Sequence, residues 1–401
     1  MLRLQGRIQH YDWGSLSAIP ELVHLPQDGK PWAEIWFGAH PGAPALVSSA
    51  QPWVPALADE SSVAASAPQP LDEWIARNHD AALGAGREAL PFLVKLLAAG
   101  RPLSLQAHPD MAQAIAGYRA EQDAGTPRDQ ANYADSSHKP ESLFALAPTR
   151  ALAGFRRPAA IAADLDRIGS PQLEPIAHLL RAGTLRDAFT RLLQLPAADV
   201  QPALDALAVA VSDGQSWGQD AIAVAQEILI AYPGDVGVLA TIFLNAVALA
   251  PGQALSVGAG IVHCYLSGLG LEVMANSDNV LRAGLTSKRV DVAELVRILN
   301  FEPAPALIDD PPVHAAAGAK VRAYPPHFAE YAVTVYELDG TGPYAETEAK
   351  GPRILLGLDG ASTIESDQGR VILGAGDAAF AGDGELLRLQ GTGTVAIVRV
   401  P

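Results

Sequence analysis

The sequence predicts a mainly β protein with an α-helical insertion, and three observations indicate this fold class. Short runs rich in Val, Ile, Leu and aromatic residues, bounded by Gly, Pro, Asn and Asp, occur towards both ends of the chain. Between about Pro158 and Tyr232, apolar residues instead recur every three or four positions, as in amphipathic helices. After Pro233-Gly234-Asp235 the strand pattern resumes, so the helical block interrupts a β region.

The composition is that of a globular protein with an acidic surface. The chain has 401 residues, enough for two or three domains, of which 49% are apolar and 18% charged. Its formal charge is −16, which argues against binding to nucleic acid or to anionic membranes. An anionic small substrate would therefore need at least two Lys or Arg side chains at its site.

The first residues contain neither a long apolar core nor a cleavage-site pattern, and no charge-free apolar run reaches membrane-spanning length. The single cysteine, Cys264, excludes an internal disulfide framework and fits a reducing compartment. We therefore expect a soluble, cytoplasmic protein in which Cys264 is a buried structural thiol.

The first third of the chain predicts strands, a loop and two helices. Strands are expected at Arg3 to Gln9, Glu34 to Phe37, Phe92 to Leu97 and Leu103 to His108. The Ser-, Pro- and Ala-rich residues 48 to 70 predict a surface loop, and helical spacing begins at Leu71. Asp110 is a candidate N-cap for a helix over Met111 to Gln122.

The remaining elements are a helical block followed by strands. Thr184 with Asp187 resembles a weak capping box within the block. The C-terminal strands are expected at Tyr331 to Leu338, Arg353 to Leu358, Val371 to Phe380 and Thr394 to Val400. A short internal sequence similarity, between GAGIVHCY and GAGDAAFA, is consistent with two β-barrels of similar plan.

A candidate metal site begins with the sequence LSLQAHPD. Gln106 and His108 lie two residues apart in a predicted strand, so both side chains point the same way. The motif HKPE adds the carboxylate of Glu141, and His263 lies in a later strand-like run. One amide oxygen, two imidazoles and one carboxylate form a set that zinc accepts. The alternative for the first pair is a half-buried strand pair with satisfied hydrogen bonds.

Several ordered segments resemble the type I phosphomannose isomerases, also called mannose-6-phosphate isomerases, of the cupin superfamily. They lie within about residues 1 to 300 and read YDWGS, AEIWFGAHP, LPFLVKLLAAGRPLSLQAHPD, HKPE, GAGIVHCYLSG and LEVMANSDNVLRAGLTSKRVDV. The resemblance implies one Zn²⁺ per chain bound by Gln106, His108, Glu141 and His263. It also implies that Arg282 is catalytic. Cys264 stands where alanine is frequent in the family.

The resemblance implies two cupin-like β-barrels and a helical domain. The expected catalytic, metal-binding domain comprises residues 1–155 and 233–300, and the inserted helical domain comprises residues 156–232. Residues 301–401 are expected to form a degenerate cupin-like domain. Their fold is inferred from architecture, because this part carries little of the family's motifs.

The expected reaction interconverts mannose 6-phosphate and fructose 6-phosphate by proton transfer through an enediol(ate). Negative charge develops on oxygen, where a divalent metal and an arginine stabilise it. The base is left open between Lys139 and His138, with Glu272 next. An ion pair with an acid is the alternative role for Lys139.

The candidates for the phosphate contact are Lys288, Ser104 and Lys95, each in or beside a matching motif. Because Lys95 lies in the apolar run LVKLL, a structural ion pair explains it equally well.

Two other functions are kept open. A cupin with two His and a Glu can hold iron or manganese for oxygen chemistry, and a catalytically silent cupin would bind sugar without product. Turnover to the ketose without oxygen uptake separates the isomerase from both. The expected partner is a phosphosugar, with neither nucleic acid nor membrane, and the family suggests a monomer. A role in GDP-mannose biosynthesis depends on the direction of flux in the cell.

Overall fold

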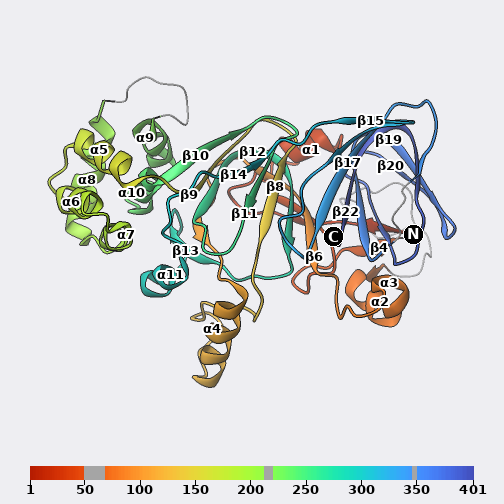
Figure 1. Ribbon diagram of the computed structural model, residues 1–401, viewed down its shortest axis with the longest axis horizontal. Coiled ribbons are helices and arrows are strands. Elements are labelled where there is room, and N and C mark those ends of the chain that lie inside the picture. The colour runs from red at the N-terminus through yellow and green to blue at the C-terminus, as the bar shows by residue number, and fades with distance from the viewer. Residues whose placement is uncertain (49–67, 212–219, 346–349) are drawn as a thin grey trace. The chain divides into compact units, whose positions relative to one another are not determined.

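The computed structural model describes residues 1–48, 68–211, 220–345 and 350–401, which form antiparallel sheets and helices (Figure 1). It divides into two compact units. The first unit contains Met1–Ala98, Leu271–Asn276 and Asp309–Pro401, and the second contains Ala99–Gly270 and Ser277–Ile308. The loop predicted over residues 48 to 70 falls almost wholly outside the described residues. None of the helices described combines the length and apolar character needed to cross a membrane.

The first unit contains a large antiparallel sheet that joins the two ends of the chain. Its strand order is β15 (His314–Ala316), β16 (Ala319–Ala323), β17 (Ala332–Leu338), β22 (Arg388–Arg399), β19 (Arg353–Ser366), β21 (Ala378–Ala381), β1 (Leu2–Gln5), β4 (Leu46–Ser48) and β5 (Gln69–Pro70). Two short strands flank this path, β18 (Tyr344–Ala345) on β22 and β20 (Gly369–Leu373) on β19. Apolar side chains such as Leu355, Leu389 and Ile397 form its buried core.

A second set of strands in the first unit runs β2 (Arg7–Gln9), β3 (Glu34–Phe37) and β6 (Phe92–Ala99). The helices of this unit are α1 (Ala18–Leu22), α2 (Leu71–Arg77) and α3 (His79–Leu83). The helix expected from Leu71 is thus two short helices, separated at Asn78. The strand expected at Val371 to Phe380 is also two elements, because a turn through Gly374 and Asp377 separates β20 from β21.

The strands of the second unit gather around β12 (His263–Ala275), whose last residues, Leu271–Ala275, belong to the first unit. The neighbours of β12 here are β7 (Leu105–Ala107), β8 (Glu141–Ala145) and β9 (Thr149–Phe155). Beyond them, β13 (Leu281–Gly284) pairs with β7, β11 (Ala254–Val257) with β8, and β10 (Leu244–Leu249) with β9. The short β14 (Leu307–Asp309) lies next to β11 in the strand order. β12 therefore lies next to three strands that precede it by more than 100 residues in the chain.

The predicted helical block is present between β9 and β10. It consists of α5 (Pro158–Ile168), α6 (Glu174–Arg181), α7 (Leu185–Leu193), α8 (Ala197–Val209), α9 (Ala221–Ala231), α10 (Gly237–Ala240) and the 3₁₀ turn η1 (Thr241–Phe243). Its apolar faces share one core with the nearby strands, in which Phe155, Phe189 and Phe243 pack edge to face. The capping box expected at Thr184 is not formed, because the hydroxyl donates to the carbonyl of Leu179.

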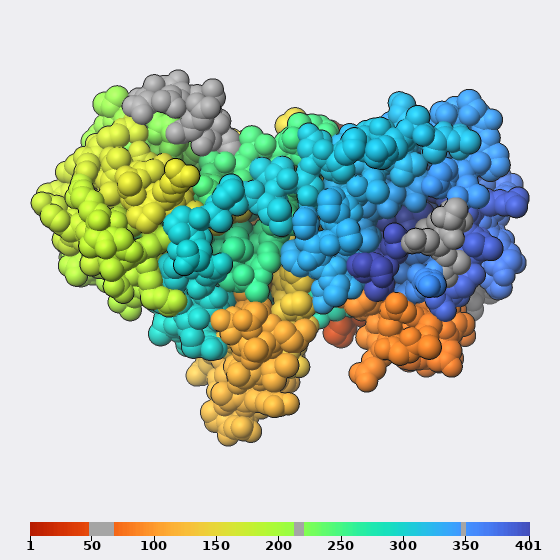
Figure 2. Space-filling view, viewed as in Figure 1, coloured from red at the N-terminus to blue at the C-terminus, as the bar shows by residue number. Residues whose placement is uncertain are grey.

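Helix α4 (Met111–Asp123) projects from the strands of the second unit (Figures 1 and 2). The predicted cap at Asp110 is confirmed as a full capping box: its carboxylate accepts from the Gln113 backbone, and the Gln113 side chain accepts from the Asp110 backbone. The last helix of this unit, α11 (Val292–Ile298), begins at the capping residue Asp291.

The two compact units do not follow the predicted domain boundaries. Residues 1–98 belong with 309–401, because β1 lies between β21 and β4 in one sheet. The helical block belongs to the same unit as the strands that carry the predicted metal ligands, since Leu105, Leu152 and Cys264 share its core.

Candidate metal centre and its surroundings

The register of three strands places Gln106 at the centre of the candidate site. His263, the first residue of β12, lies opposite Gln106 on β7, and Arg282 on β13 lies opposite the same residue. Residues directly opposite on neighbouring strands project from the same face of a sheet. Strand pairing thus aligns one predicted ligand, Gln106, with another, His263, and with the predicted catalytic arginine.

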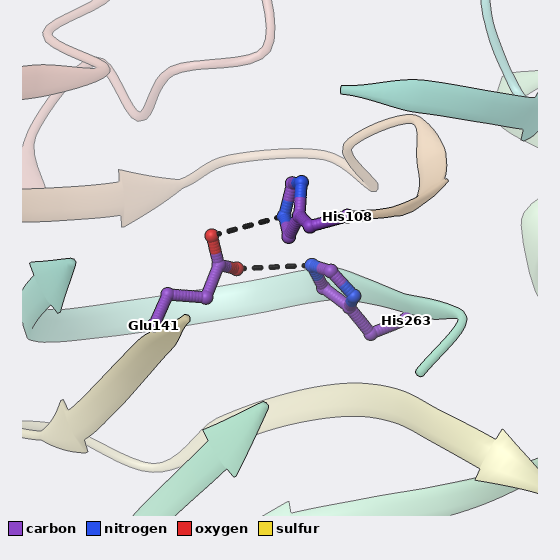
Figure 3. A group of neighbouring side chains, drawn as sticks. All are labelled: His108, Glu141 and His263. Carbon is purple, nitrogen blue, oxygen red and sulfur yellow. Dashed lines mark ion pairs between the residues drawn. The ribbon is translucent and has the colours of Figure 1, made fainter. Parts of the chain in front are cut away.

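Two imidazoles and one carboxylate converge in a buried cluster (Figure 3). His108 Nε2 lies 3.2 Å from Glu141 Oε2, and His263 Nε2 lies 2.9 Å from Glu141 Oε1. All three side chains are fully buried. His108 lies just beyond the end of β7, so its convergence depends on the following turn as well as on the strand.

Backbone carbonyls fix the orientation of both imidazoles. His108 Nδ1 is 2.7 Å from the Asn279 carbonyl oxygen, and His263 Nδ1 is 2.9 Å from that of Ile261. Because a carbonyl only accepts, each Nδ1 carries a proton, and each Nε2 is the ring nitrogen that faces the cluster. This is the arrangement in which histidine binds a metal.

Burial and neighbouring charges keep both ligand types in their metal-binding protonation states. Burial, assisted by the Lys139 charge, lowers the pKa of His108 to about 4, so its imidazole is neutral at physiological pH. Burial alone would raise the pKa of Glu141, but its interactions with its neighbours, above all with the Lys139 charge, hold it well below its ordinary value.

The three residues fit a zinc ion. Zinc bonds of about 2.1 Å in tetrahedral geometry separate neighbouring ligand atoms by roughly 3.4 Å, close to the two separations in the cluster. Gln106 stands at its half-buried edge, with Nε2 3.4 Å from His263 Nε2 and Oε1 accepting from Ser104 Oγ at 3.3 Å. For Gln106 Oε1 to bind the same zinc ion, the amide group must flip so that Oε1 and Nε2 exchange places.

Lys139 is the cation of this cluster. Its Nζ donates to Glu141 Oε2 and lies 3.3 Å from His108 Nε2, and the side chain is buried. His138 precedes it in the chain and is half-buried. Lys139 is thus a predicted proton-transferring residue whose nitrogen contacts two atoms of the cluster, Glu141 Oε2 and His108 Nε2.

Arg282 and Lys288 line a cleft of 280 Å³ together with Asn132 and Asp291. Burial lowers the pKa of Arg282, and the Arg282 charge, with burial, lowers that of Lys288. Neither side chain forms an ion pair with a carboxylate of the described ranges. Two cations without a counter-ion beside a polar cleft suit an anionic ligand.

Two other predicted residues interact with each other in the first unit. Lys95 Nζ lies 3.0 Å from Glu272 Oε2 and 3.6 Å from Glu34 Oε1, and all three side chains are buried. This is the structural ion pair that was the alternative explanation for Lys95.

Tyr265 and Asn279 contribute contacts that sequence reasoning did not assign. The Tyr265 hydroxyl donates to Glu141 Oε1 at 3.1 Å, and the Asn279 backbone orients His108. Tyr265 lies two residues after His263 in a strand-like run, and this spacing indicates that the two side chains point to the same face of the sheet. The contact of the Asn279 carbonyl leaves no signal in the sequence, because every residue has a backbone carbonyl.

Comparisons with known proteins show which family the chain resembles over its whole length. A family model described as phosphomannose isomerase type I, catalytic domain, matches residues 1–158. Mannose-6-phosphate isomerase of Salmonella typhimurium is 36% identical and that of Homo sapiens 30% identical, with 99% and 92% of this chain covered, and 99% and 88% of theirs.

Solved structures give the same result. A variant of phosphomannose isomerase from Salmonella typhimurium is 33% identical and superposes with a TM-score of 0.87, covering 100% of this chain and 99% of that one. A zinc-bound mannose 6-phosphate isomerase is 32% identical with a TM-score of 0.86 and the same coverage.

Proposed function

The chain belongs to the type I phosphomannose isomerases, with zinc as cofactor, and we propose that it interconverts mannose 6-phosphate and fructose 6-phosphate by proton transfer between C2 and C1. The observation that carries the proposal is the buried convergence of His108, Glu141 and His263, with Lys139 against it and Arg282 in register with Gln106.

The residues proposed to hold zinc are Gln106, His108, Glu141 and His263. Bound there, zinc supplies a Lewis acid that stabilises negative charge on the sugar oxygens. The neutral His108, the anionic Glu141 and the two Nδ1 contacts to carbonyls support this assignment.

Lys139 is the proposed base. Its neutral amine takes the proton from C2 of the aldose and returns it to C1, while the hydroxyl proton passes from O2 to O1. The substrate is thereby isomerised without net oxidation. The position of Nζ beside Glu141 favours Lys139 over His138.

Arg282 is proposed to stabilise the charge that develops on oxygen, because its guanidinium is permanently protonated and projects from the face that carries Gln106. Lys288 is the proposed phosphate contact, since it lines the same cleft without a counter-ion among the described residues. Ser104, which donates to Gln106, is a proposed hydroxyl donor near the sugar. Contacts of Lys95 and Glu272 with the substrate stay predictions.

The finer architecture is also part of the proposal. We propose that the antiparallel strands form two cupin-like barrels and that α5–α9 form a helical insertion in the metal-binding one. The helices between β9 and β10 support the second point. The monomeric state stays a prediction.

The test uses mannose 6-phosphate with the zinc-loaded protein in D₂O. We expect fructose 6-phosphate by NMR, deuterium incorporation at the transferred position, no oxygen uptake, and loss of turnover on chelation. Oxygen consumption would favour the oxygen-chemistry alternative, and binding without product would favour the silent one.

Lys139→Met tests the assignment of the base. Because general base catalysis contributes about 10²–10⁴-fold, kcat should fall by at least a hundredfold with zinc retained and substrate still bound. Lys320→Met is the matched control, since Lys320 is an exposed lysine paired with Glu337 in the first unit. Turnover of Lys139→Met at the parent rate would exclude Lys139 as the base.

A further inference from the structure

We infer that Asp135, Ser277 and Asn279, here named the Asp135–Asn279 clasp, are positioning residues that hold the metal ligands in place. The inference rests on the metal centre proposed above. The clasp joins two segments about 140 residues apart, one that precedes HKPE and one that precedes Arg282.

Asn279 is completely buried, and both ends of its amide are used. Its Oδ1 accepts from the backbone N–H of Ala134 at 2.7 Å and of Asp135 at 3.3 Å. Its Nδ2 donates to the carbonyls of Asp135 and Ser137, each at 2.8 Å. The side chain thus fixes the backbone that leads to Lys139 and Glu141.

Asp135 fixes the opposite segment. Its carboxylate accepts from Ser277 Oγ at 2.9 Å and from the backbone N–H of Asp278 at 2.9 Å, as well as from that of Ser137. Within the ranges that the structure describes, Asp135 has no ion pair with a cation. Its acceptors are therefore used to order the turn at Ser277–Asn279.

The clasp reaches the metal centre through a backbone atom. The carbonyl of the clasped Asn279 is the group 2.7 Å from His108 Nδ1. The same turn leads into β13 and Arg282, and the clasped Ala134–Ser137 segment leads to Lys139 and Glu141. One set of hydrogen bonds therefore positions His108 against Glu141, although the two come from different strands.

Loosening the clasp should disturb metal binding before it disturbs the fold. Outer groups that orient metal ligands typically contribute about 10–100-fold to metal affinity. Asp135→Asn keeps the shape of the side chain but turns one of its two acceptors into a donor facing N–H and O–H groups. Asn279→Asp removes both donors to the carbonyls and puts a carboxylate where Nδ2 now lies 3.3 Å from Asp135 Oδ1. Asn279→Asp should therefore weaken zinc binding more than Asp135→Asn does.

The experiment measures zinc affinity by chelator competition, the visible absorption of the Co²⁺-substituted protein, and thermal unfolding. For Asp135→Asn we expect about tenfold weaker zinc binding and a changed cobalt spectrum. The control is Asp220→Asn, because Asp220, like Asp135, accepts backbone N–H bonds, at the start of α9. Asp220 is more deeply buried and also lies 3.6 Å from Arg167 Nη2, so its substitution is a demanding test of stability alone. It should lower the unfolding temperature and leave the cobalt spectrum and zinc affinity unchanged.

The inference would be overturned if Asp135→Asn had the zinc affinity and the cobalt spectrum of the parent protein. It would also be overturned if Asp135→Asn changed zinc affinity and the cobalt spectrum no more than Asp220→Asn does. If Asp135→Asn fails to fold, Ser277→Ala decides, because it removes only one hydroxyl from the clasp. A parent protein that binds neither zinc nor cobalt would refute the metal centre itself, so the two failures are distinguishable.

Discussion

We propose that single side chains in the candidate site divide into those that hold the metal and those that act on the substrate. His263 presents Nε2 to Glu141 and is locked by the Ile261 carbonyl, so it belongs to the first group. Arg282 lines a cleft, lies opposite Gln106 on the neighbouring strand and is not one of the three residues that converge in the cluster, so it belongs to the second. Substitutions should separate the two roles.

His263→Ala removes one of the three buried ligand atoms, and we expect the purified protein to lose its zinc. Arg282→Ala should retain zinc and lose about 10²–10³-fold in kcat, because a preorganised charge at the developing oxyanion is missing. Metal analysis and steady-state kinetics check both results. Arg181→Ala, which breaks an exposed ion pair with Asp166, is the control. Full zinc content in His263→Ala would contradict its assignment as a ligand.

Helix α11 depends on its cap, and the cap also anchors the loop before the clasp. Asp291 Oδ1 accepts from the backbone N–H of Glu294 at 3.0 Å, and Oδ2 accepts from Asn132 Nδ2 at 3.2 Å. The bond from the Glu294 backbone is the main cause that lowers the pKa of Asp291 below its ordinary value of 3.8.

The pH dependence of this cap follows from the direction of the shift. Because the folded-state pKa is lowered, the unfolded state binds more protons, and the stabilisation is complete above the ordinary pKa of 3.8. It is lost as pH falls through the folded-state value. Asp291→Ala should cost about 1 kcal/mol of unfolding free energy at pH 7, and the difference from the parent should narrow below pH 3.8.

Urea unfolding at pH 7 and at acid pH, with chelator present throughout so that zinc release does not contribute, measures this effect. Asp291→Asn, which keeps an N-cap acceptor, is the control and should retain most of the stability at pH 7. A cost of Asp291→Ala that does not change with pH would contradict the assigned role of the charge.

Zinc should stabilise the folded chain as a whole, because its ligands come from segments that only the folded state brings together. Gln106 and His263 are 157 residues apart. A ligand that binds only the folded state adds about 2.7 kcal/mol at a concentration 100 times its dissociation constant.

We therefore expect chelation to lower the unfolding temperature of the parent protein and to have little effect on His263→Ala. Scanning calorimetry with and without added zinc checks this. An equal response of both proteins would mean that the stabilising ion binds elsewhere.

The net charge of −16 is a property of the whole molecule that the substrate must overcome. The sequence predicts at least two cations at a phosphate site, and we propose Arg282 and Lys288, which line one cleft, for that role. The charge of Lys95 is matched by Glu272 and Glu34, so its contact with phosphate stays a prediction.

The sequence by itself determined the order of most strands and helices and the chemical types of the proposed ligands, Gln106, His108, Glu141 and His263, because periodicity and residue chemistry are local properties. It placed α4 and its capping residue within one residue of the observed start and end. It placed element ends less well at the α2 and α3 pair, which the single residue Asn78 separates, and at the β20 and β21 pair, which a turn over residues 374–377 separates.

Only the tertiary structure decided which of these side chains meet. Strand register set His263 and Arg282 opposite Gln106, packing set Lys139 against Glu141, and a carbonyl of Asn279 set the tautomer of His108. Each of these contacts except that of Lys139 joins residues more than 100 positions apart. Such contacts depend on the pairing of whole strands, and no local pattern of residues encodes that pairing.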